Sequence, residues 1–346
     1  MKSMRTIALA VLAVLCVAPA RASVAADTLG RDGGLPVRVA RVRHAIDSML
    51  NRRDTRDSAR VDTTYLRRAP ERLRLKVRIN CSGSDIDTRG VYGGAPYEAR
   101  LEAKLRTTLS FGASYRGLSV GVALNPAKLT GEDRDYELNL NAYGNRCGAD
   151  VILQSSKTYE GTLGGGVGDR DVPVGSVSQD MLTVNAYYVF SGRSFSFPAA
   201  FTQSWLQLRS SGSFMLGLTL MGGRLKSAQG ADGLSGERTL GIICAGIGAG
   251  YGYNWVVGGK WLLHLSTLPE LVVFSRSRLT TPGGREKMPY RFPNVIAVGR
   301  MAVVRHFDRY FVGMTAVVNT SHLGDSRQLS VGNTKWRARM FVGVKL

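Results

Sequence analysis

A regular alternation between aliphatic and basic side chains constrains the fold of this chain more than any other feature. Residues 72–79 read Arg-Leu-Arg-Leu-Lys-Val-Arg-Ile, so every second side chain is aliphatic and each one between carries a positive charge. A β-strand places successive side chains on opposite faces, which separates these two classes completely. Similar alternation recurs in residues 100–111, 136–141 and 335–346. The sequence therefore predicts an all-β protein.

The alternating pattern predicts about twelve strands, and the connections between them predict the kind of sheet. The strands are expected near residues 72–80, 98–113, 117–124, 135–143, 147–157, 181–190, 212–225, 237–253, 260–275, 294–306, 310–321 and 334–346. The connections after the first, third, fifth, seventh, ninth and eleventh strands are expected to be long (roughly 81–97, 125–134, 158–180, 226–236, 276–293 and 322–333), and most others short. Long loops at one end and tight turns at the other are typical of outer-membrane barrels with both termini in the periplasm.

A soluble β-sandwich or lipocalin-like barrel would also alternate, but with its apolar face inward. Two features favour the membrane. The polar faces carry successive Arg and Lys side chains, which suits a wet lumen, and aromatic residues such as Trp255, Trp261 and Tyr310 gather near predicted strand ends. We therefore predict a transmembrane antiparallel up-and-down β-barrel over residues 71–346, located in the cell outer membrane. Its expected partners are outer-membrane lipid, lipopolysaccharide and, during insertion, the barrel-assembly machinery, and its oligomeric state stays open.

The first 26 residues have the layout of a secretory signal peptide. Lys2 and Arg5 precede an apolar run over residues 7–17, and a stretch of small residues follows Pro19. The run is too short to span a bilayer comfortably. Residues 27–70 are predicted to form a periplasmic N-terminal arm, partly helical or disordered, with a plug inside the barrel as the alternative role.

The charge of the chain, +20 from 46 Lys and Arg against 26 Asp and Glu, would usually indicate a nucleic-acid partner. Export and strand-wise alternation explain it without one. Cys81, Cys147 and Cys244 remain after the signal peptide, with wide spacing and no neighbouring His, so neither a zinc site nor a disulfide framework is indicated. Whether two of them pair stays open, and no metal or cofactor is expected.

Four stretches carry a family resemblance beyond this architecture. They are residues 62–65 with 69–73; residues 140–150; residues 185–190 leading into 195–204 and 212–214; and residues 248–255. With them the chain resembles the family called domain of unknown function 4421, found in Bacteroidetes-type Gram-negative bacteria and regarded as outer-membrane barrels. The resemblance runs from about Asp62 to the C-terminus and implies a location and a fold, but no activity. Many outer-membrane barrels end in Phe, whereas this chain ends in Leu346.

Basic side chains are expected to line one wall of the lumen, because the first and last strands of a closed barrel are neighbours. The predicted wall consists of Arg72, Arg74, Lys76, Arg78, Arg100, Lys104, Arg106, Lys335, Arg337, Arg339 and Lys345. If a continuous water path exists, such a wall favours anions. The alternative is that carboxylates such as Glu137 and Asp150 reach across and make a packed ion-pair network.

One pattern in the predicted ninth strand suggests an enzyme. His264 and Ser266 share a face with Glu270, as a base and a nucleophile would, and resemble the His-x-Ser of outer-membrane lipid A deacylases. However, His264 and Ser266 alternate with the outward residue Trp261, so both are expected to point inward, away from lipid. Pro269 also interrupts the strand before Glu270. We expect a lumen histidine and no enzyme, with a lipid hydrolase as the alternative function.

The segment 191–211 is too apolar for a solvated turn, since Phe195, Phe197, Phe201 and Trp205 surround Pro198. We expect a structural plug, with a constriction or partner contact as the alternative. The function predicted from the sequence is a non-enzymatic structural or pore-forming barrel. An adhesin or receptor acting through the long external loops is a further alternative, and their composition indicates no particular ligand.

Overall fold

The computed structural model describes most of the chain from residue 60 onward. The described residues are 60–69, 73–92, 95–115, 118–124, 135–165, 170–228, 236–287, 290, 292–325 and 328–346. The predicted signal peptide, the predicted arm up to residue 59 and Arg72 lie outside them. The chain divides into two compact units, Met1–Arg53 and Asp54–Leu346, and every described residue belongs to the second. In this described part, no helix is both long and apolar enough to cross a membrane.

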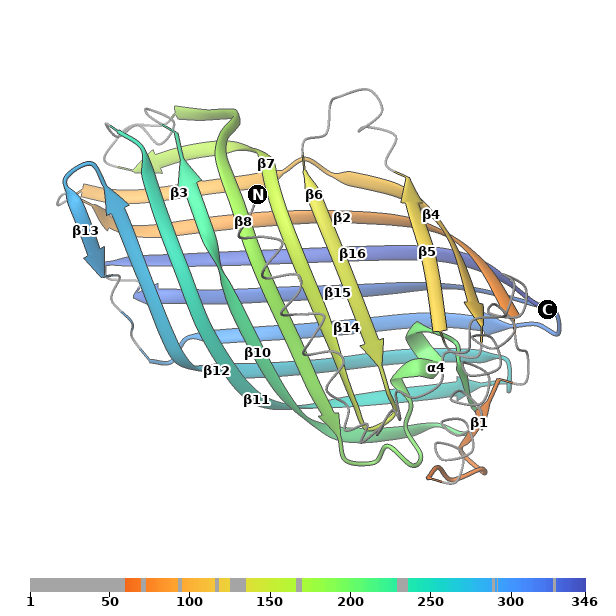
Figure 1. Ribbon diagram of the computed structural model, residues 1–346. Coiled ribbons are helices and arrows are strands. Elements are labelled where there is room, and N and C mark those ends of the chain that lie inside the picture. Colours follow the sequence, from red (N-terminus) through yellow and green to blue (C-terminus); the bar gives the residue numbers. More distant parts are fainter. Residues whose placement is uncertain are drawn as a thin grey trace, which may run out of the picture. The chain divides into compact units, whose positions relative to one another are not determined.

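Antiparallel strands make up nearly all of the described structure (Figure 1). The long strands are β2 (Leu73–Tyr92), β3 (Ala95–Ala103), β4 (Arg106–Tyr115), β5 (Leu118–Leu124), β6 (Tyr136–Tyr143), β7 (Cys147–Gly165), β8 (Arg170–Val189), β10 (Ser211–Ser227), β11 (Arg238–Val257), β12 (Trp261–Thr281), β14 (Val295–His306), β15 (Tyr310–Asp325) and β16 (Leu329–Lys345). The short elements are β1 (Leu66–Arg68), α4 (Phe197–Phe201), β9 (Trp205–Gln207) and β13 (Gly284–Lys287).

Ten of the described strands close into a ring, in the order β2, β16, β15, β14, β12, β11, β10, β8, β7, β3 and back to β2. The prediction of an all-β antiparallel barrel is confirmed. Three strands lie outside the ring: β4 pairs with the first half of β2, β5 pairs with β4, and β6 pairs with the first half of β7. The second half of β7 pairs directly with β3, and this pairing closes the barrel.

A β-bulge separates β3 from β4, both of which pair with β2. Glu102 of β3 pairs with Asp85, and Arg106 of β4 pairs with Ser82. Four steps along one strand therefore face three steps along β2, so one extra residue is inserted. Because side chains alternate with a period of two, the extra residue reverses which ones point inward. Odd-numbered residues point inward in β3, and even-numbered residues do so in β4.

The outer face carries an apolar band around the half of the barrel where β2 begins and β16 ends, which we call the terminal half. On β12 the band runs from Trp261, which is 40% exposed, to Phe274, which is 52% exposed. Thirteen steps at about 3.3 Å give about 43 Å of strand, which at a tilt of about 45° covers a height of about 30 Å. That height matches the hydrocarbon core of a bilayer, also about 30 Å.

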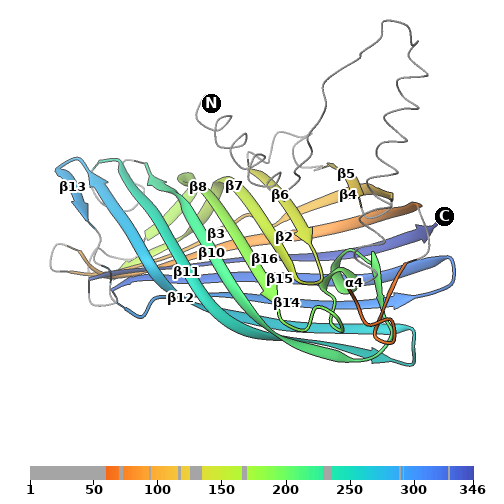
Figure 2. The ribbon, with the colours of Figure 1, turned by 60° about the horizontal axis from the view of Figure 1, so that its bottom comes forward.

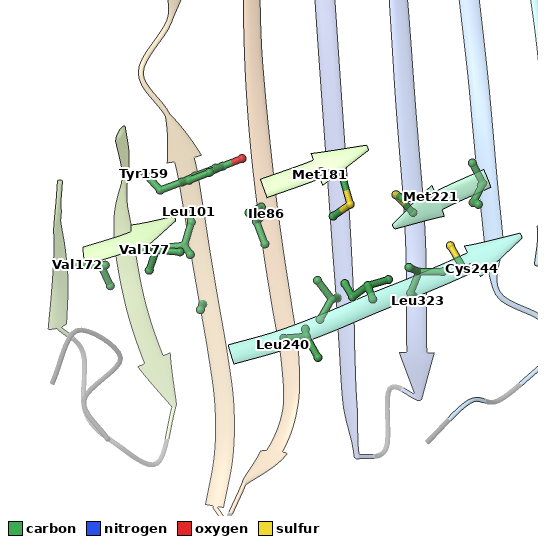
Figure 3. Close-up of a cluster of buried hydrophobic side chains, with 14 of the residues drawn as sticks. Ile86, Leu101, Tyr159, Val172, Val177, Met181, Met221, Leu240, Cys244 and Leu323 are labelled. Carbon is green, nitrogen blue, oxygen red and sulfur yellow. The ribbon is translucent and has the colours of Figure 1, made fainter. Parts of the chain in front are cut away.

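Polarity is inverted in the other half of the barrel, which we call the distal half. Outside, β12 continues with the exposed Arg276 and Arg278, and β10 with Arg224 and Lys226. Inside, buried apolar side chains from many strands pack against one another (Figure 3). This cluster includes Ile86, Leu101, Tyr159, Val172, Val177, Met181, Met221, Leu240, Cys244 and Leu323. The distal half therefore has the charged exterior and apolar interior of a soluble protein.

This inversion corrects the predicted loop lengths. Much of the expected long connections 81–97, 158–180, 276–293 and 322–333 is strand, because β2, β7, β8, β12, β15 and β16 continue into them. Charged side chains such as Arg276 and Arg278 lie exposed on the outer face of these continuing strands. The backbone instead keeps its hydrogen-bonded ladder well beyond the apolar band.

The segment between β8 and β10 folds into the terminal half of the barrel. It contains α4 and β9, and Figure 2 shows α4 at the end where the C-terminus lies. Ser196 caps α4, because its hydroxyl accepts a hydrogen bond from the amide of Ala199 at 3.2 Å, and Pro198 lies in the first turn. β9 pairs with β1, so the described residues before the barrel join this segment.

Candidate functional site

The interior of the terminal half is the candidate functional site, and its acidic side chains lie opposite the basic wall. Glu137 of β6 accepts a hydrogen bond from the ammonium of Lys335 on β16 at 2.8 Å. The guanidinium groups of Arg337 and Arg106 lie 3.7 and 3.9 Å from the same carboxylate. The Lys335 ammonium also donates to the side-chain oxygen of Gln154 at 2.7 Å. One carboxylate therefore serves three cations from two sides of the lumen.

A second ion pair crosses the lumen between Asp150 of β7 and Arg300 of β14. The Arg300 guanidinium donates to the carboxylate at 2.9 Å, and the exposed fractions of the two side chains are 1% for Arg300 and 3% for Asp150. The guanidinium also lies over the rings of Tyr187 and Phe197, at 5.7 and 5.9 Å from their centroids. Arg300 was missed at the sequence level, since a lone Arg in an apolar strand belongs to no basic run. The signal that could have found it is its spacing: Arg300 lies two and four residues after Val298 and Ile296, which are both buried, so its side chain points inward with theirs.

Three arginines on adjacent strands share a region with little acid. Arg78 of β2 pairs in register with Phe341 of β16, so Arg339 is its diagonal neighbour on the inner face, and Arg337 follows at the next inward position. The Nε atoms of Arg78 and Arg339 are buried without a hydrogen-bond partner. The carboxylate of Glu137, beside Arg337, is the nearest acidic contact that the described residues give this group.

Two members of the predicted wall lie elsewhere. Arg100 is exposed on the outer face of β3, where its guanidinium is 3.0 Å from Glu98, and Lys104 is exposed in the bulge between β3 and β4. The bulge reverses side-chain parity, so the inward residues of β3 are apolar ones such as Leu101. Lys345 donates to the carbonyl of Phe307 at 2.9 Å, at the terminal turn. The other described members, on β2, β4 and β16, face the interior.

The plug segment, residues 191–210, makes contacts around most of the ring. Phe195 and Phe197 are fully buried, in a cluster with inward side chains of β8, β10, β12, β14 and β15. Trp205 is 6% exposed and packs in a second cluster with β12, β14, β15 and β16, and Phe201 lies partly buried against both clusters. The apolar positions that had suggested a plug or constriction therefore lie inside the barrel.

Basic side chains of β2 hold the plug segment from the other side. The Arg74 guanidinium donates to the Gln203 carbonyl, and the Lys76 ammonium donates to the Gln203 side-chain oxygen. The same ammonium lies over the rings of Phe311 and Phe341, at 5.2 and 4.7 Å from their centroids. Part of the basic wall thus binds the plug segment rather than lining open water.

His264 and Ser266 have the hydrogen bonds of a base and a nucleophile. The histidine Nε2 lies 2.9 Å from the Ser266 hydroxyl, and its Nδ1 lies 2.7 Å from the side-chain oxygen of Asn254. Asn254, rather than Glu270, occupies the orienting position. His264 is only 3% exposed, and the rings of Phe195, Phe197 and Phe201 lie within 6 Å of its own. The plug segment therefore covers this constellation, and Asn254 also binds the plug, donating to the Ser196 carbonyl at 3.0 Å.

A cavity lies within the apolar interior of the distal half. It measures about 110 Å³, and its wall comes from β2, β3, β7, β8, β10, β11, β12 and β16. Its lining includes Ala99, Leu101, Leu163, Val177, Leu240 and Val331. The sequence prediction missed this chamber, because it placed loops here and turned Leu101 outward. The signal was the run Tyr97, Ala99, Leu101 and Ala103, which is one apolar face of a strand.

The described residues contain no group of three or more His, Cys, Asp or Glu side chains arranged to hold a metal ion. Cys81, Cys147 and Cys244 all lie in described strands or at their ends, and each is a free thiol. Cys244 belongs to the apolar cluster of the distal half.

Comparison with known proteins gives a family and several similar barrels. The family model described as Domain of unknown function (DUF4421) matches residues 60–345, and no curated protein matches the sequence. Among solved structures, the chain is similar to the translocator domain of the autotransporter NalP from Neisseria meningitidis, at 10% identity and a TM-score of 0.31, covering 88% of this chain and 98% of that one. It is also similar to the P. putida toluene transporter TodX (9% identity, TM-score 0.25, covering 80% and 91%) and the Ralstonia pickettii toluene transporter TbuX (10%, 0.21, covering 80% and 90%).

Proposed function

The chain belongs to the DUF4421 family, a domain of unknown function, so its role has to be inferred from the barrel itself. We propose that it is a non-enzymatic barrel of the outer membrane, whose lumen favours anions and is closed by its own plug segment. The observation that carries the proposal is the plug segment, which contacts inward side chains of β2, β8, β10, β11, β12, β14, β15 and β16.

The apolar band supports the location. Its height matches the hydrocarbon core of a bilayer, and antiparallel ladders pair the backbone of the strands that carry it. On this proposal lipid and lipopolysaccharide surround the terminal half, the barrel-assembly machinery inserts it, and the termini lie on the periplasmic side.

The charge balance of the lumen supports the anion preference. Among the described residues, eight cations face the interior of the terminal half: Arg74, Lys76, Arg78, Arg106, Arg300, Lys335, Arg337 and Arg339. The buried acids beside them are Asp135, Glu137, Asp150 and Glu270, half as many. A water path past the plug segment would run along this excess of positive charge, which lowers the energy of a passing anion and raises that of a cation.

The enclosure of His264 and Ser266 supports a role without catalysis. A nucleophile acts only if a substrate carbonyl can approach it, and here aromatic rings fill the space beside the imidazole. Overexpression of the protein should therefore leave lipid A masses unchanged. A loss of acyl chains that disappears in a Ser266→Ala variant would contradict this part of the proposal.

Planar-bilayer recording tests the closed anion pore. The wild type should show little conductance, whereas the double variant Phe195→Ala, Phe197→Ala loosens the plug segment and should give steps that are anion-selective. Phe214→Ala is the matched control, since this ring is 69% exposed on the outer face. Adding Arg78→Gln and Arg339→Gln to the plug variant should reduce the anion preference. Cation-selective steps, or steps of equal frequency in the wild type, would overturn the proposal.

A further inference from the structure

We propose that the distal half of the barrel contains a binding site for a small apolar molecule, or for the apolar end of a larger one. The site is the cavity of about 110 Å³ lined by the distal strands, which is partly open to the outside. It lies beyond the apolar band and is separate from the charged interior and plug segment of the terminal half. The inference is therefore independent of the proposed pore.

The lining determines what chemistry the cavity accepts. Leu101, Leu163, Leu240 and Val331 present only hydrocarbon to it, and their exposed fractions are between 2% and 8%. The side chains of the lining that carry a polar group are Thr88, Tyr97, Ser227 and Arg238, and all come from strand positions close to the distal ends of β2, β3, β10 and β11. A cavity with an apolar body and polar groups near one end suits an apolar ligand, with any polar group at that end.

The size of the cavity limits the buried part of the ligand. An apolar cavity of about 150 Å³ in another protein stays dry and holds benzene. The present cavity is somewhat smaller, so it accepts about one aromatic ring or a short alkyl segment. Water held against the apolar part of this wall finds few partners, because an ordered water needs two to four polar groups and the lining there is hydrocarbon.

The inverted polarity of the distal half explains why such a cavity can exist here. The outward side chains at these heights are charged, for example Asp87, Glu98 and Arg278, so the wall stands in water and not in lipid. Apolar side chains have turned inward and pack across the barrel, yet they leave volume unfilled at this level. Atoms facing a void lose dispersion contacts, which a ligand of the right shape restores.

The ring holds the cavity open. Its walls are strands paired on both sides, such as β11 between β10 and β12, and β16 between β15 and β2. A wall held by continuous ladders relaxes less around a void than loops would. The binding volume is thus preformed, which lowers the cost of ordering on binding.

Benzene titration of the methyl-labelled full-length protein in lipid nanodiscs tests the site. The Leu101 and Val331 methyl resonances should shift and saturate as benzene is added. Leu265, which is 58% exposed on the outer face, supplies the internal reference. Its methyl resonances should shift linearly without saturation, because benzene only partitions into the surrounding lipid.

Two variants and one control complete the test. Ala99→Leu adds three carbon atoms to the lining and should weaken benzene binding at least about tenfold. Ala249→Leu makes the same change at an exposed position of β11 and should leave the affinity within about twofold. Val177→Phe fills the same cavity from β8 and replaces the first variant if that one does not fold.

The proposal is supported if the Leu101 and Val331 methyl resonances shift to saturation in the wild type and no longer do so in the variants that fill the cavity. Linear shifts at Leu101 and Val331, matching those of Leu265, would show that benzene does not bind there and would overturn the inference. An unchanged affinity in the filled variants would also overturn it. Neither result bears on the bilayer recordings, so the two proposals stand or fall separately.

Discussion

Removing one partner of the buried pair Asp150–Arg300 should destabilise the barrel far more than removing both. At 2.9 Å and an effective dielectric constant of about 20, the attraction between unit charges is about 6 kcal/mol. Taking each ion out of water costs several kcal/mol, so the attraction and the desolvation largely cancel. Asp150→Asn leaves the Arg300 charge buried beside two aromatic rings, and we expect it to cost about 3–5 kcal/mol.

The double-mutant cycle separates this effect from simple loss of packing. Arg300→Met should cost a similar 3–5 kcal/mol, part of it from the lost contacts with the Tyr187 and Phe197 rings. The combined variant Asp150→Asn, Arg300→Met should be within about 2 kcal/mol of the wild type, because no uncompensated charge remains. The free energy of unfolding is measured by urea titration of the refolded barrel in detergent, followed by tryptophan fluorescence.

The exposed pair Glu98–Arg100 provides the matched control. Its atoms are 3.0 Å apart, nearly the same distance as in the buried pair, but its side chains are 44% and 62% exposed. Glu98→Gln should therefore cost less than about 1 kcal/mol. If the combined variant at Asp150 and Arg300 loses the sum of the two single losses, burial of an unpaired charge is not the cause and the reasoning is refuted.

Two further predictions follow from the same structure. Glu137→Gln leaves Lys335, Arg337 and Arg106 without their shared carboxylate, and we expect the free energy of unfolding to fall by about 3 kcal/mol in the same urea assay; a loss below about 1 kcal/mol would contradict the role of this carboxylate as a hub. The Thr64 hydroxyl and amide donate hydrogen bonds to the Asp62 carboxylate at 2.7 and 2.9 Å, and these bonds lower the pKa of Asp62 below 3.8. The hydrogen bonds therefore stabilise the turn fully above pH 3.8, and this stabilisation is lost as the pH falls through the lowered pKa. In an NMR titration of the Asp62 carboxyl, Thr64→Val should move the midpoint up toward 3.8, and an unchanged midpoint would count against the assignment.

The strands themselves could be predicted from the sequence, because the period of two is a local property of an extended backbone. The ranges 136–143 and 261–281, for example, begin within a residue of the expected positions. Which face points inward is a different matter. It depends on what surrounds the wall, and on our proposal this chain is surrounded by lipid at one height and by water at another.

The sequence prediction used one rule for the whole chain, that polar side chains point into the lumen, and this rule placed Arg100 there. Residues 100–111 alternate without interruption in the sequence, so the bulge between Glu102 and Arg106 leaves no local mark. Its presence follows from the pairing with β2, which is a tertiary property. The correction moves Arg100 outside and puts Leu101 into the wall of the distal cavity.

The candidate site was predictable in its parts and not in its pairings. Glu137 and Asp150 could be named in advance as carboxylates that reach across, since both lie on polar faces. Their partners depend on the order of strands around the ring and on its diameter: Glu137 on β6 meets Lys335 on β16, and Asp150 on β7 meets Arg300 on β14. The exclusion of β4, β5 and β6 from the ring, which brings β3 against β7, could not be inferred from strand count alone.

The change of polarity along the strands also separates the two proposed roles in space. The plug segment and the basic wall occupy the terminal half, at the height of the apolar band, where on our proposal they control whether ions cross the membrane. The apolar cavity lies in the distal half, beyond the band, where a ligand can bind without entering the charged interior. On our proposal the plug segment closes the lumen between the cavity and the terminal end of the barrel. We therefore expect benzene to bind equally well to the wild type and to the variant Phe195→Ala, Phe197→Ala, and an affinity that changes more than about tenfold between them would show that the two halves act as one channel.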